Sequence, residues 1–386
     1  ARNRVLAAAK DDNERIIITK AVLFATLDQG LPLLKNYDWV CEAVIEDLTA
    51  KRALFADLEK YRREGSVIST NTSGIPLAAI TEGLPLRLRQ DIVVTHFFNP
   101  VRVMRLLEII PGADTRPETV ERIAAFGRDV LGKGVVRAKD TVNFIANRIG
   151  CFWMLAGLHK AKPYLAEGIT QEQIDAVLSA PVGLPATGLY GLIDLIGLDV
   201  MDYVGRNLAD NLPKGDPGHA FTRFPATEQA LLERGQLGRK SGGGFYRVTK
   251  AADGSKTKEV FDLVKGAWRP SVPVAITETD PLFAHTPLGR FAWDLMGDTL
   301  LYAADLVPEI ADDIVNIDRA MRWGFNWQRG PFEFLDHLGP KRVIARLRSE
   351  GRRLPRMLEV LENSGQERFY TDGQYLSRDG INRTIP

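Results

Sequence analysis

Cysteine and histidine are scarce in this chain. Only two of its 386 residues are cysteine and five are histidine. The cysteines form no CxxC pair, and no cluster of histidine and cysteine has the spacing of metal ligands. These shortages exclude a disulfide framework and give no reason to expect a metal site. Cys41 and Cys151 each lie in apolar sequence, which predicts two buried free thiols in a reducing compartment.

Long apolar runs and a strong charge of one sign are also missing. No stretch reaches the roughly 18 consecutive apolar residues of a membrane-spanning helix, and no signal peptide opens the sequence. The net charge is only +1. We therefore expect no membrane insertion, no nucleic-acid partner and a cytoplasmic location. A composition of 45% hydrophobic and 26% charged residues is typical of a globular protein, and the length predicts two or three domains.

Glycine is absent before Gly30. A dinucleotide-binding fold opens with a strand, a GxGxxG turn and a helix whose N-terminus binds the pyrophosphate. The numbered sequence does not contain that unit. We expect that the chain starts inside a larger protein or has lost its first segment, and this leaves open whether the chain as numbered binds a dinucleotide.

The following residues have the alternating strands and helices of a nucleotide-binding sheet. Residues 38–45 form a nearly continuous apolar run, which predicts a strand buried on both faces. An amphipathic helix is expected at 49–63 and a short strand at 66–69. Ligands of such sheets lie beyond the carboxyl ends of the parallel strands. The sequence places Glu46 and Asn71–Ser73 at those ends.

Two apolar segments, Ile92–Val94 and Met104–Ile110, predict neighbouring strands with the turn signal Asn99-Pro100 between them. Such strands can bring His96 and Glu108 side by side. A carboxylate that accepts a hydrogen bond from one ring nitrogen fixes the tautomer and raises the basicity of the other nitrogen, which makes a general base. The alternative is a histidine that caps one strand and a glutamate at the edge of the other.

The pattern changes to continuous helices near residue 140. Before this point, Thr115 and Glu118 have the spacing of a capping box at the start of a helix. Gly132 and Gly134 are expected to end that helix rather than to bind a phosphate. Beyond it, apolar residues spread around long helices as far as about Leu232, which predicts an all-helical region.

Residues 236–247 and 251–258 are rich in glycine and polar residues and are expected to be connections. Lys240-Ser241 lies beside three glycines, but the strand before and the helix after that a phosphate-binding loop requires are missing. We interpret this stretch as a structural loop.

Two segments of the helical region, 167–197 and 309–339, share a pattern that predicts two homologous units. The matching positions are Ile174-Asp175 and Ile317-Asp318, Gly188 and Gly330, and Asp194 and Asp336. Asn147 has no counterpart in the second copy and can therefore contact a substrate, whereas Arg148 recurs as Arg290 and is expected to serve packing. The second copy is expected to be structural, in place of the dimer partner of a single-unit enzyme.

Several of these motifs follow one another in a characteristic order. Thr70-Asn71-Thr72-Ser73 precedes THFFNP, which contains His96, and Glu108 and the sequence NFIANRI at 143–149 come later. Together they resemble the 3-hydroxyacyl-CoA dehydrogenases, from about residue 39 to residue 339. The two helical copies are similar to the multifunctional fatty-acid oxidation proteins that also carry an enoyl-CoA hydratase domain, which is absent here.

The resemblance implies an α/β fold class. An incomplete Rossmann-like nucleotide-binding domain is expected at 1–139, without its N-terminal β-α-β unit. Two homologous all-helical domains are expected at 140–270 and 271–386.

The implied function is the NAD-dependent oxidation of (S)-3-hydroxyacyl-CoA to 3-ketoacyl-CoA in fatty-acid β-oxidation. His96 is then the general base and Glu108 its orienting partner, while Ser73 and Asn147 bind the substrate and take part in catalysis. Positions that match the family's contacts to NAD are Glu46, Lys51, Asn71, Ser73 and Asn99. The implied partners are the acyl-CoA substrate and, beyond it, hydratase and thiolase activities.

Each role has a simpler alternative. Glu46 and Lys51 can merely complement a helix dipole and the solvent, and Asn71 and Asn99 can be turn residues. Ser73 can cap a short helix. At the level of the whole chain, the alternative is a catalytically silent acyl-CoA-binding scaffold for a hydratase domain. A dehydrogenase of small 3-hydroxy acids is a third reading, but that group uses a lysine as its base.

Overall fold

The computed structural model describes residues 7, 9–250, 253–278 and 280–386. Its N-terminal part contains a five-stranded mixed sheet with the strands in sequential order. The strands are β1 (Trp39–Glu42), β2 (Val67–Thr70), β3 (Ile92–Phe97), β4 (Leu106–Pro111) and β5 (Gly134–Arg137). β1, β2 and β3 are parallel, β4 runs antiparallel to β3, and β5 is parallel to β4.

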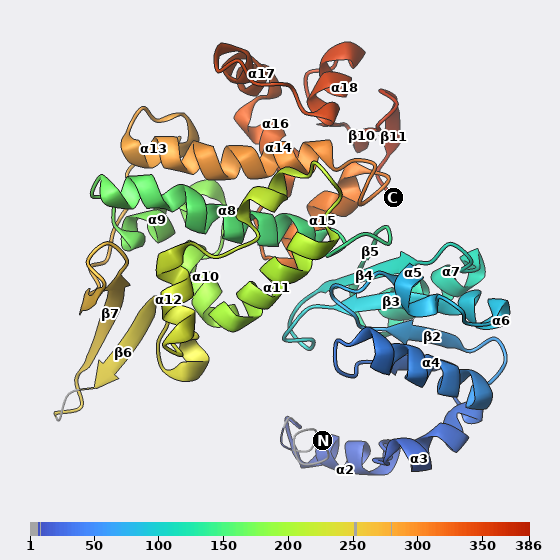
Figure 1. The fold of residues 1–386 in the computed structure, drawn as a ribbon. Coiled ribbons are helices and arrows are strands. Elements are labelled where there is room, and N and C mark those ends of the chain that lie inside the picture. The colour runs from blue at the N-terminus through green and yellow to red at the C-terminus, as the bar shows by residue number, and fades with distance from the viewer. Residues whose placement is uncertain (1–6, 8, 251–252, 279) are drawn as a thin grey trace.

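Helices cover both faces of this sheet. Side chains alternate between the two faces along each strand, so each buried strand packs against helices on both sides. On one face, Val93 and Ile109 pack with Ile123 of α7 (Pro117–Ala125). On the other face, Val94 packs with Phe55 of α4 (Leu48–Tyr61). The shorter helices of this part are α5 (Leu77–Thr81) and α6 (Leu86–Arg89). Helices α2 (Asp12–Ala21) and α3 (Leu27–Gly30) bury no residue, and Figure 1 shows them below the sheet.

Three local predictions for this part are wrong. Strand β1 is not buried on both faces, because it is the edge strand of the sheet among the described residues, and Cys41 on it is exposed rather than buried. The capping box at Thr115 does not form. Its hydroxyl donates to the carbonyl of Ile92 and accepts from the amide of Gly112, so that it joins the helix entry to the sheet, and Arg116 is the N-cap.

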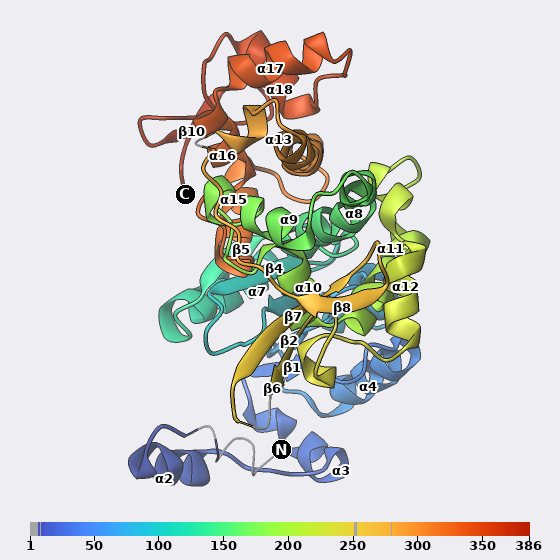
Figure 2. The ribbon, with the colours of Figure 1, turned by 90° about the vertical axis from the view of Figure 1, so that its left-hand side faces the viewer.

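The second part of the chain is built around α8 (Ala146–Ala166), most of whose residues are buried. Four further helices follow it: α9 (Gln171–Val177), α10 (Gly188–Ile196), α11 (Leu198–Asn211) and α12 (Ala226–Glu233). A three-stranded antiparallel sheet then follows, made of β6 (Tyr246–Lys250), β7 (Lys256–Asp262) and β8 (Ala267–Pro270). The β6–β7 hairpin projects from the helices at the lower left of Figure 1, and Figure 2 views it from that side.

The third part packs on α8 through its first helices. Its helices are α13 (Pro287–Ala292), α14 (Asp298–Asp305), α15 (Ile314–Gly324), α16 (Pro331–Leu338), α17 (Pro340–Ser349) and α18 (Arg356–Ser364). It ends in a small sheet of β9 (Tyr370–Thr371), β10 (Gln374–Leu376) and β11 (Asn382–Thr384). In Figure 1 this part lies above α8 and reaches the five-stranded sheet through α15.

The prediction of all-helical regions is therefore wrong in one respect: each region ends in a three-stranded sheet. Of the residues that were expected to be connections, only 246–247 belong to β6 and 256–258 to β7, while 251 and 252 lie outside the described residues. These strands escaped detection because their outer positions are polar and exposed, so no apolar run marks them. None of the helices in the described part of the chain has both the length and the apolar character needed to cross a bilayer.

Arg148 links the second and third parts. Its buried guanidinium donates to Asp216 at 2.6 Å, to Glu309 at 3.0 Å and to the hydroxyl of Tyr302 at 2.5 Å. The recurring arginine, Arg290, is exposed and donates to a backbone carbonyl. The expectation that both arginines serve the same packing is thus wrong, because Arg148 is buried and paired with two carboxylates, whereas Arg290 is exposed.

Candidate active site

The site forms where β3 and β4 pair. In the antiparallel register His96 lies directly opposite Glu108, and the ring Nδ1 is 2.6 Å from the carboxylate Oε2. His96 is 3% exposed and Glu108 is fully buried. The two strands and the turn predicted from the sequence are present, and they bring this pair together as expected. A hydrogen bond this short to a buried carboxylate is of the charge-assisted kind.

The second oxygen of Glu108 faces the N-terminus of α8. Oε1 accepts the backbone amides of Ile145 at 3.2 Å and Ala146 at 2.9 Å. The positive end of the helix dipole favours a negative charge at this position. The carboxylate is therefore held at both oxygens, and among the described residues its side-chain partner is the histidine ring.

The other ring nitrogen of His96 faces an exposed serine. Nε2 lies 3.1 Å from the hydroxyl of Ser73. If Nδ1 carries the proton toward Glu108, Nε2 has a free lone pair and accepts from Ser73. The ring is packed between Phe98 and Phe144, with ring centroids 4.7 Å and 5.4 Å away. The pair is thus rigidly placed, and only Nε2 points toward a group that reaches solvent.

The chain enters α8 through two left-handed residues, Asn143 (φ 61°) and Phe144 (φ 52°). Non-glycine residues in this region are strained and are often found at functional sites. Here the unusual backbone places the Phe144 ring on His96 immediately before the two amides that bind Glu108.

Glu46 and Lys51 belong to a buried ionic network rather than to the solvent. Lys51 is 1% exposed and donates to both carboxylate oxygens of Glu42, at 2.9 Å and 3.0 Å. It also lies 3.2 Å from Glu46. Burial by itself would raise the pKa of Glu46, but the hydrogen bond from Thr72 and the charge of Lys51 outweigh it, so the pKa is lowered. The alternative of a solvent-exposed lysine is therefore wrong.

Glu46 also fixes the loop after β2. Its Oε1 accepts the hydroxyl of Thr72 at 2.5 Å and the amides of Ser73 at 2.9 Å and Gly74 at 3.1 Å. The loop that presents the Ser73 hydroxyl to His96 is thus held by Glu46, which lies between β1 and α4.

The three asparagines have different environments. Asn71 ties neighbouring strands together. Its side-chain Oδ1 accepts the backbone amide of Phe97 at 2.9 Å, and its backbone amide donates to the backbone carbonyl of Glu42. Asn99 is exposed in the turn after β3, at the cis Asn99-Pro100 bond. Asn147 lies half-buried in the first turn of α8, next to the amides that bind Glu108.

Sequence reasoning missed Glu42, Thr72, Phe98 and Phe144. Glu42 was detectable, because it is a charged residue within an apolar strand and such a residue needs a partner. The two phenylalanines were visible inside the motifs that carry His96 and Asn147, but nothing in the spacing indicates that both rings pack on the histidine.

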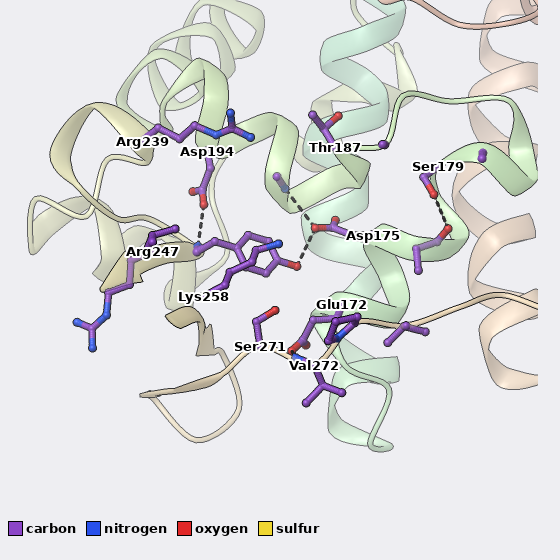
Figure 3. Close-up of a pocket in the computed structure, with 18 of the residues that line it drawn as sticks. Glu172, Asp175, Ser179, Thr187, Asp194, Arg239, Arg247, Lys258, Ser271 and Val272 are labelled. Atoms are coloured by element: carbon purple, nitrogen blue, oxygen red, sulfur yellow. Dashed lines mark hydrogen bonds between the residues drawn. The ribbon is translucent and has the colours of Figure 1, made fainter. Parts of the chain in front are cut away.

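A large groove lies elsewhere, between α9, α10 and the β6–β8 sheet. It has a volume of about 1080 Å³, and Figure 3 shows Arg239 and Lys258 on its wall, with Asp175 and Asp194 facing them. Both carboxylates accept backbone amides. The glycine-rich loop beside it is held by Ser241, which accepts from Leu237 and donates to Gly238 and Gly243. This geometry supports the interpretation of a structural loop.

The chain matches two family models in succession. Residues 10–141 match the 3-hydroxyacyl-CoA dehydrogenase NAD-binding domain, and residues 144–248 match the 3-hydroxyacyl-CoA dehydrogenase C-terminal domain. The first match covers the five-stranded sheet with His96 and Glu108, and the second begins at the left-handed residues before α8.

Two of three curated relatives carry the same family name. A probable 3-hydroxyacyl-CoA dehydrogenase of Bacillus subtilis is 36% identical over 91% of this chain and 45% of its own length. A putative fatty acid oxidation complex trifunctional enzyme of Rickettsia prowazekii is 34% identical over 81% of this chain and 44% of its length. A probable 3-hydroxyacyl-CoA dehydrogenase of Deinococcus radiodurans is 36% identical over 63% of this chain and 67% of its length. The chain thus spans less than half of the first two relatives.

The crystal structure of 3-hydroxybutyryl-CoA dehydrogenase from Escherichia coli has the same fold. The TM-score is 0.69 at 24% identity, over 94% of this chain and 89% of the other. The two successive domain matches, together with relatives of this identity and coverage, show that the chain belongs to the 3-hydroxyacyl-CoA dehydrogenase family.

Proposed function

We propose that this chain carries the catalytic centre for oxidation of an (S)-3-hydroxyacyl-CoA to the 3-ketoacyl-CoA in fatty-acid β-oxidation. The observation that carries the proposal is the buried His96–Glu108 pair, whose free ring nitrogen is directed to the exposed hydroxyl of Ser73. Oxidation of a secondary alcohol needs such a base, placed within hydrogen-bond reach of the hydroxyl.

In this mechanism the proton of the substrate hydroxyl passes to Nε2 of His96 as the carbonyl forms. Glu108 holds Nδ1–H and stabilises the imidazolium that results. Ser73 and Asn147 hydrogen-bond the reacting oxygen or the thioester carbonyl and stabilise the charge that develops there. When bound, NAD supplies the acceptor for the hydride that leaves C3.

The residues present fit the nicotinamide end of NAD. Ser73 and Asn99 are exposed at the carboxyl ends of β2 and β3, where ligands of parallel strands bind. We propose that they contact the cofactor directly, with Asn71 between them. Glu46, in the loop after β1, and Lys51, on α4, have their charges paired, and we propose that they hold this edge for the ribose. The glycine-rich turn that binds a pyrophosphate is not among the numbered residues.

The third part of the chain is proposed to be a second copy of the second part, covering α8 in place of a dimer partner. The recurring aspartates and glycines support this, and so does the packing of α13 and α14 on α8. The likeness to a relative named as a trifunctional enzyme supports hydratase and thiolase activities as partners.

The test uses the natural full-length polypeptide with acetoacetyl-CoA and NADH, followed at the NADH absorbance band. His96→Gln is expected to fold normally and to lose about two to four orders of magnitude in turnover, as removal of a general base should. His285→Gln is the matched control, because His285 is an exposed histidine far along the chain. A wild-type protein without detectable activity would favour the silent scaffold instead. So would a His96→Gln protein that keeps most of the wild-type activity.

A further inference from the structure

The C-terminal end of α15 enters the space beside the His96–Glu108 pair. We call Trp323, Gly324 and Phe325 the wedge. Helix α15 packs on β4 and β5, so the wedge, which comes from the last part of the chain, approaches the strand that carries Glu108, and Gly324 lies against Leu106 of that strand. No motif of the sequence pointed to this segment.

One side of the wedge supports His96. The ring centroids of Phe325 and Phe98 are 6.4 Å apart in an edge-to-face arrangement. The centroid of the Phe98 ring is 4.7 Å from that of the His96 imidazole. Gly324 touches Phe98 as well, since a Cβ built on this glycine would be 3.4 Å from the Phe98 ring. The histidine ring is therefore supported by Phe98, and Phe98 is supported by the wedge.

The other side supports Glu108. A Cβ on Gly324 would lie 2.6 Å from the side chain of Leu106 and 3.4 Å from that of Ala146. Leu106 begins the strand of Glu108, and the amide of Ala146 binds its carboxylate. The tip of the Phe325 ring sits on the backbone of α8, because a Cβ on Gly150 would be 2.1 Å from its Cζ.

Trp323 anchors the wedge to the sheet. Its ring lies against the start of β5, where a Cβ on Gly134 would be 2.4 Å from the indole. The guanidinium of Arg105 lies over the same ring, 4.4 Å from its centroid. Three glycines thus create the room for close packing between separate parts of the chain. Gly134 and Gly150 lie against the rings of the wedge, and Gly324 belongs to the wedge itself.

The wedge has no equivalent in the second part of the chain. Aligning Asp175 with Asp318 places Ala180-Pro181-Val182 opposite the wedge. The alignment is supported by the next residue, since Gly183 (φ 71°) and Asn326 (φ 55°) are both left-handed. Neither tryptophan, glycine nor phenylalanine occurs in the first segment, and Ala180 and Pro181 line the open groove instead. The residues that distinguish the later copy are those that touch the catalytic part.

We propose that the wedge positions the catalytic pair, so that the third part of the chain supplies Phe325 and Gly324 as positioning residues and is more than a cover for α8. The proposal rests on the proposed dehydrogenase function. Displacement of a catalytic group by about 1 Å can cost on the order of a hundredfold in rate, and the wedge contacts both the His96 side and the Glu108 side of the pair.

The first experiment compares Phe325→Leu with Phe369→Leu in the natural full-length protein. Phe369 is a fully buried ring of the same part, packed on Phe332 and remote from the pair in the fold. Phe325→Leu is expected to lower kcat by about ten- to a hundredfold while KM changes far less. Both variants are expected to lower the melting temperature by similar amounts, but Phe369→Leu is expected to keep the kcat of the wild type. Equal kcat in the two variants overturns the proposal.

A second measurement does not depend on turnover. The short Nδ1–H bond from His96 to Glu108 is expected to give a strongly downfield proton resonance in wild-type protein and in Phe369→Leu. Phe325→Leu is expected to broaden or lose it. If the wild-type protein gives this signal but shows no dehydrogenase activity, the proposed function fails, and the signal in Phe325→Leu alone decides whether the wedge positions the pair.

A third variant covers the case in which Phe325→Leu does not fold. Gly150→Ala places a methyl group where the Phe325 ring tip lies and is expected to lower kcat and displace the resonance. Gly157→Ala is the control, because a Cβ on this glycine of the same helix would meet Leu189 and Leu295 and not Phe325, and it is expected to keep both. A Gly150→Ala protein that keeps the kcat and the resonance of this control overturns the proposal.

Discussion

The carboxylates of Asp175 and Asp318 bind the same set of groups in two different parts of the chain. Asp175 accepts the amides of Tyr190 and Gly191 at the start of α10 and the hydroxyl of Tyr246. Asp318 accepts the amides of two residues at the start of α16 and the hydroxyl of a tyrosine in the following sheet. In each copy, an aspartate joins two helices to the three-stranded sheet that follows them.

Replacing Asp175 with asparagine should change how stability depends on pH. Burial raises the pKa of Asp175 from 3.8 to about 7, although four hydrogen bonds, from the Tyr246 hydroxyl and from three backbone amides, oppose the shift. Because the folded pKa is raised, its stabilising contribution is complete below pH 4 and is lost as the pH rises through 7. Asparagine does not titrate. The free energy of unfolding of Asp175→Asn, relative to wild type, should therefore rise between pH 4 and 7.5, by a few kcal/mol at most.

Urea unfolding at half-unit steps of pH measures this difference. Asp194 and Glu228, whose pKa values burial raises to about 6 and about 7, titrate in both proteins and cancel in the comparison. A difference between the two proteins that stays constant across this range would show that Asp175 is ionised in the folded state.

These aspartates also show how far the sequence could be interpreted. The recurrence of Asp175 and Asp194 as Asp318 and Asp336 was visible as a pattern. Their hydrogen bonds explain it, because Asp194 and Asp336 each bind the two amides of a Phe-Tyr pair. That pair, Phe245-Tyr246 and Phe369-Tyr370, also recurs and could have located both small sheets. It was overlooked because the spacing between aspartate and Phe-Tyr differs between the copies.

The pairing of His96 with Glu108 could be predicted because its geometry is local. A register between two consecutive strands fixes His96 opposite Glu108, and alternation along a strand is detectable in a sequence. The groups that hold the pair come from distant segments, namely the amide of Ala146, the ring of Phe144 and the wedge. Contacts between distant segments depend on how whole helices pack, and no periodicity in a single sequence encodes them.

Glu108→Gln should reduce turnover more than it affects substrate binding. One oxygen of Glu108 accepts two amides and the other faces Nδ1 of His96. A glutamine has one oxygen and one NH₂ group, so it cannot accept on both sides. If its oxygen stays on the amides, its NH₂ faces Nδ1 and drives the ring to the tautomer that carries the proton on Nε2. We expect kcat to fall by about 10²- to 10⁴-fold, with a smaller change in KM.

Steady-state kinetics over a range of pH checks this prediction, with Glu121→Gln as control because Glu121 is an exposed glutamate on α7. A variant in which KM alone rises would make Glu108 a binding residue rather than the partner of a base.

The two cysteines should differ sharply toward alkylation. Cys41 is exposed on the edge strand β1, whereas Cys151 is buried in α8, where burial raises its pKa to about 12. Only the thiolate reacts with iodoacetamide, so Cys151 is protected both by its protonation and by its position. Peptide mass spectrometry after labelling at pH 8 should find Cys41 modified and Cys151 unmodified until denaturant is added. Labelling of Cys151 at the same rate as Cys41 would contradict the buried placement of α8.

Glycine should be a better replacement for Asn143 than alanine. Its backbone is left-handed (φ 61°), and its 3% exposed side chain has an Nδ2 group without a hydrogen-bond partner in the described part of the chain. A buried donor without a partner costs about 1–3 kcal/mol, and glycine both removes this donor and adopts the conformation freely. The greater freedom of glycine in the unfolded chain costs about 0.4–1 kcal/mol in return. Asn143→Gly is therefore expected to match or exceed the stability of the wild type.

Alanine also removes the donor, but it pays about 1–2 kcal/mol for the left-handed backbone. Thermal unfolding should therefore give a higher melting temperature for Asn143→Gly than for Asn143→Ala, which serves as the control for side-chain removal. A glycine variant less stable than the alanine variant would mean that the backbone at this entry to α8 is not left-handed. A glycine variant clearly less stable than wild type would mean that the Asn143 amide has a partner, and the neighbouring Asn207, whose amide also approaches Gly74, would be the first place to look for it.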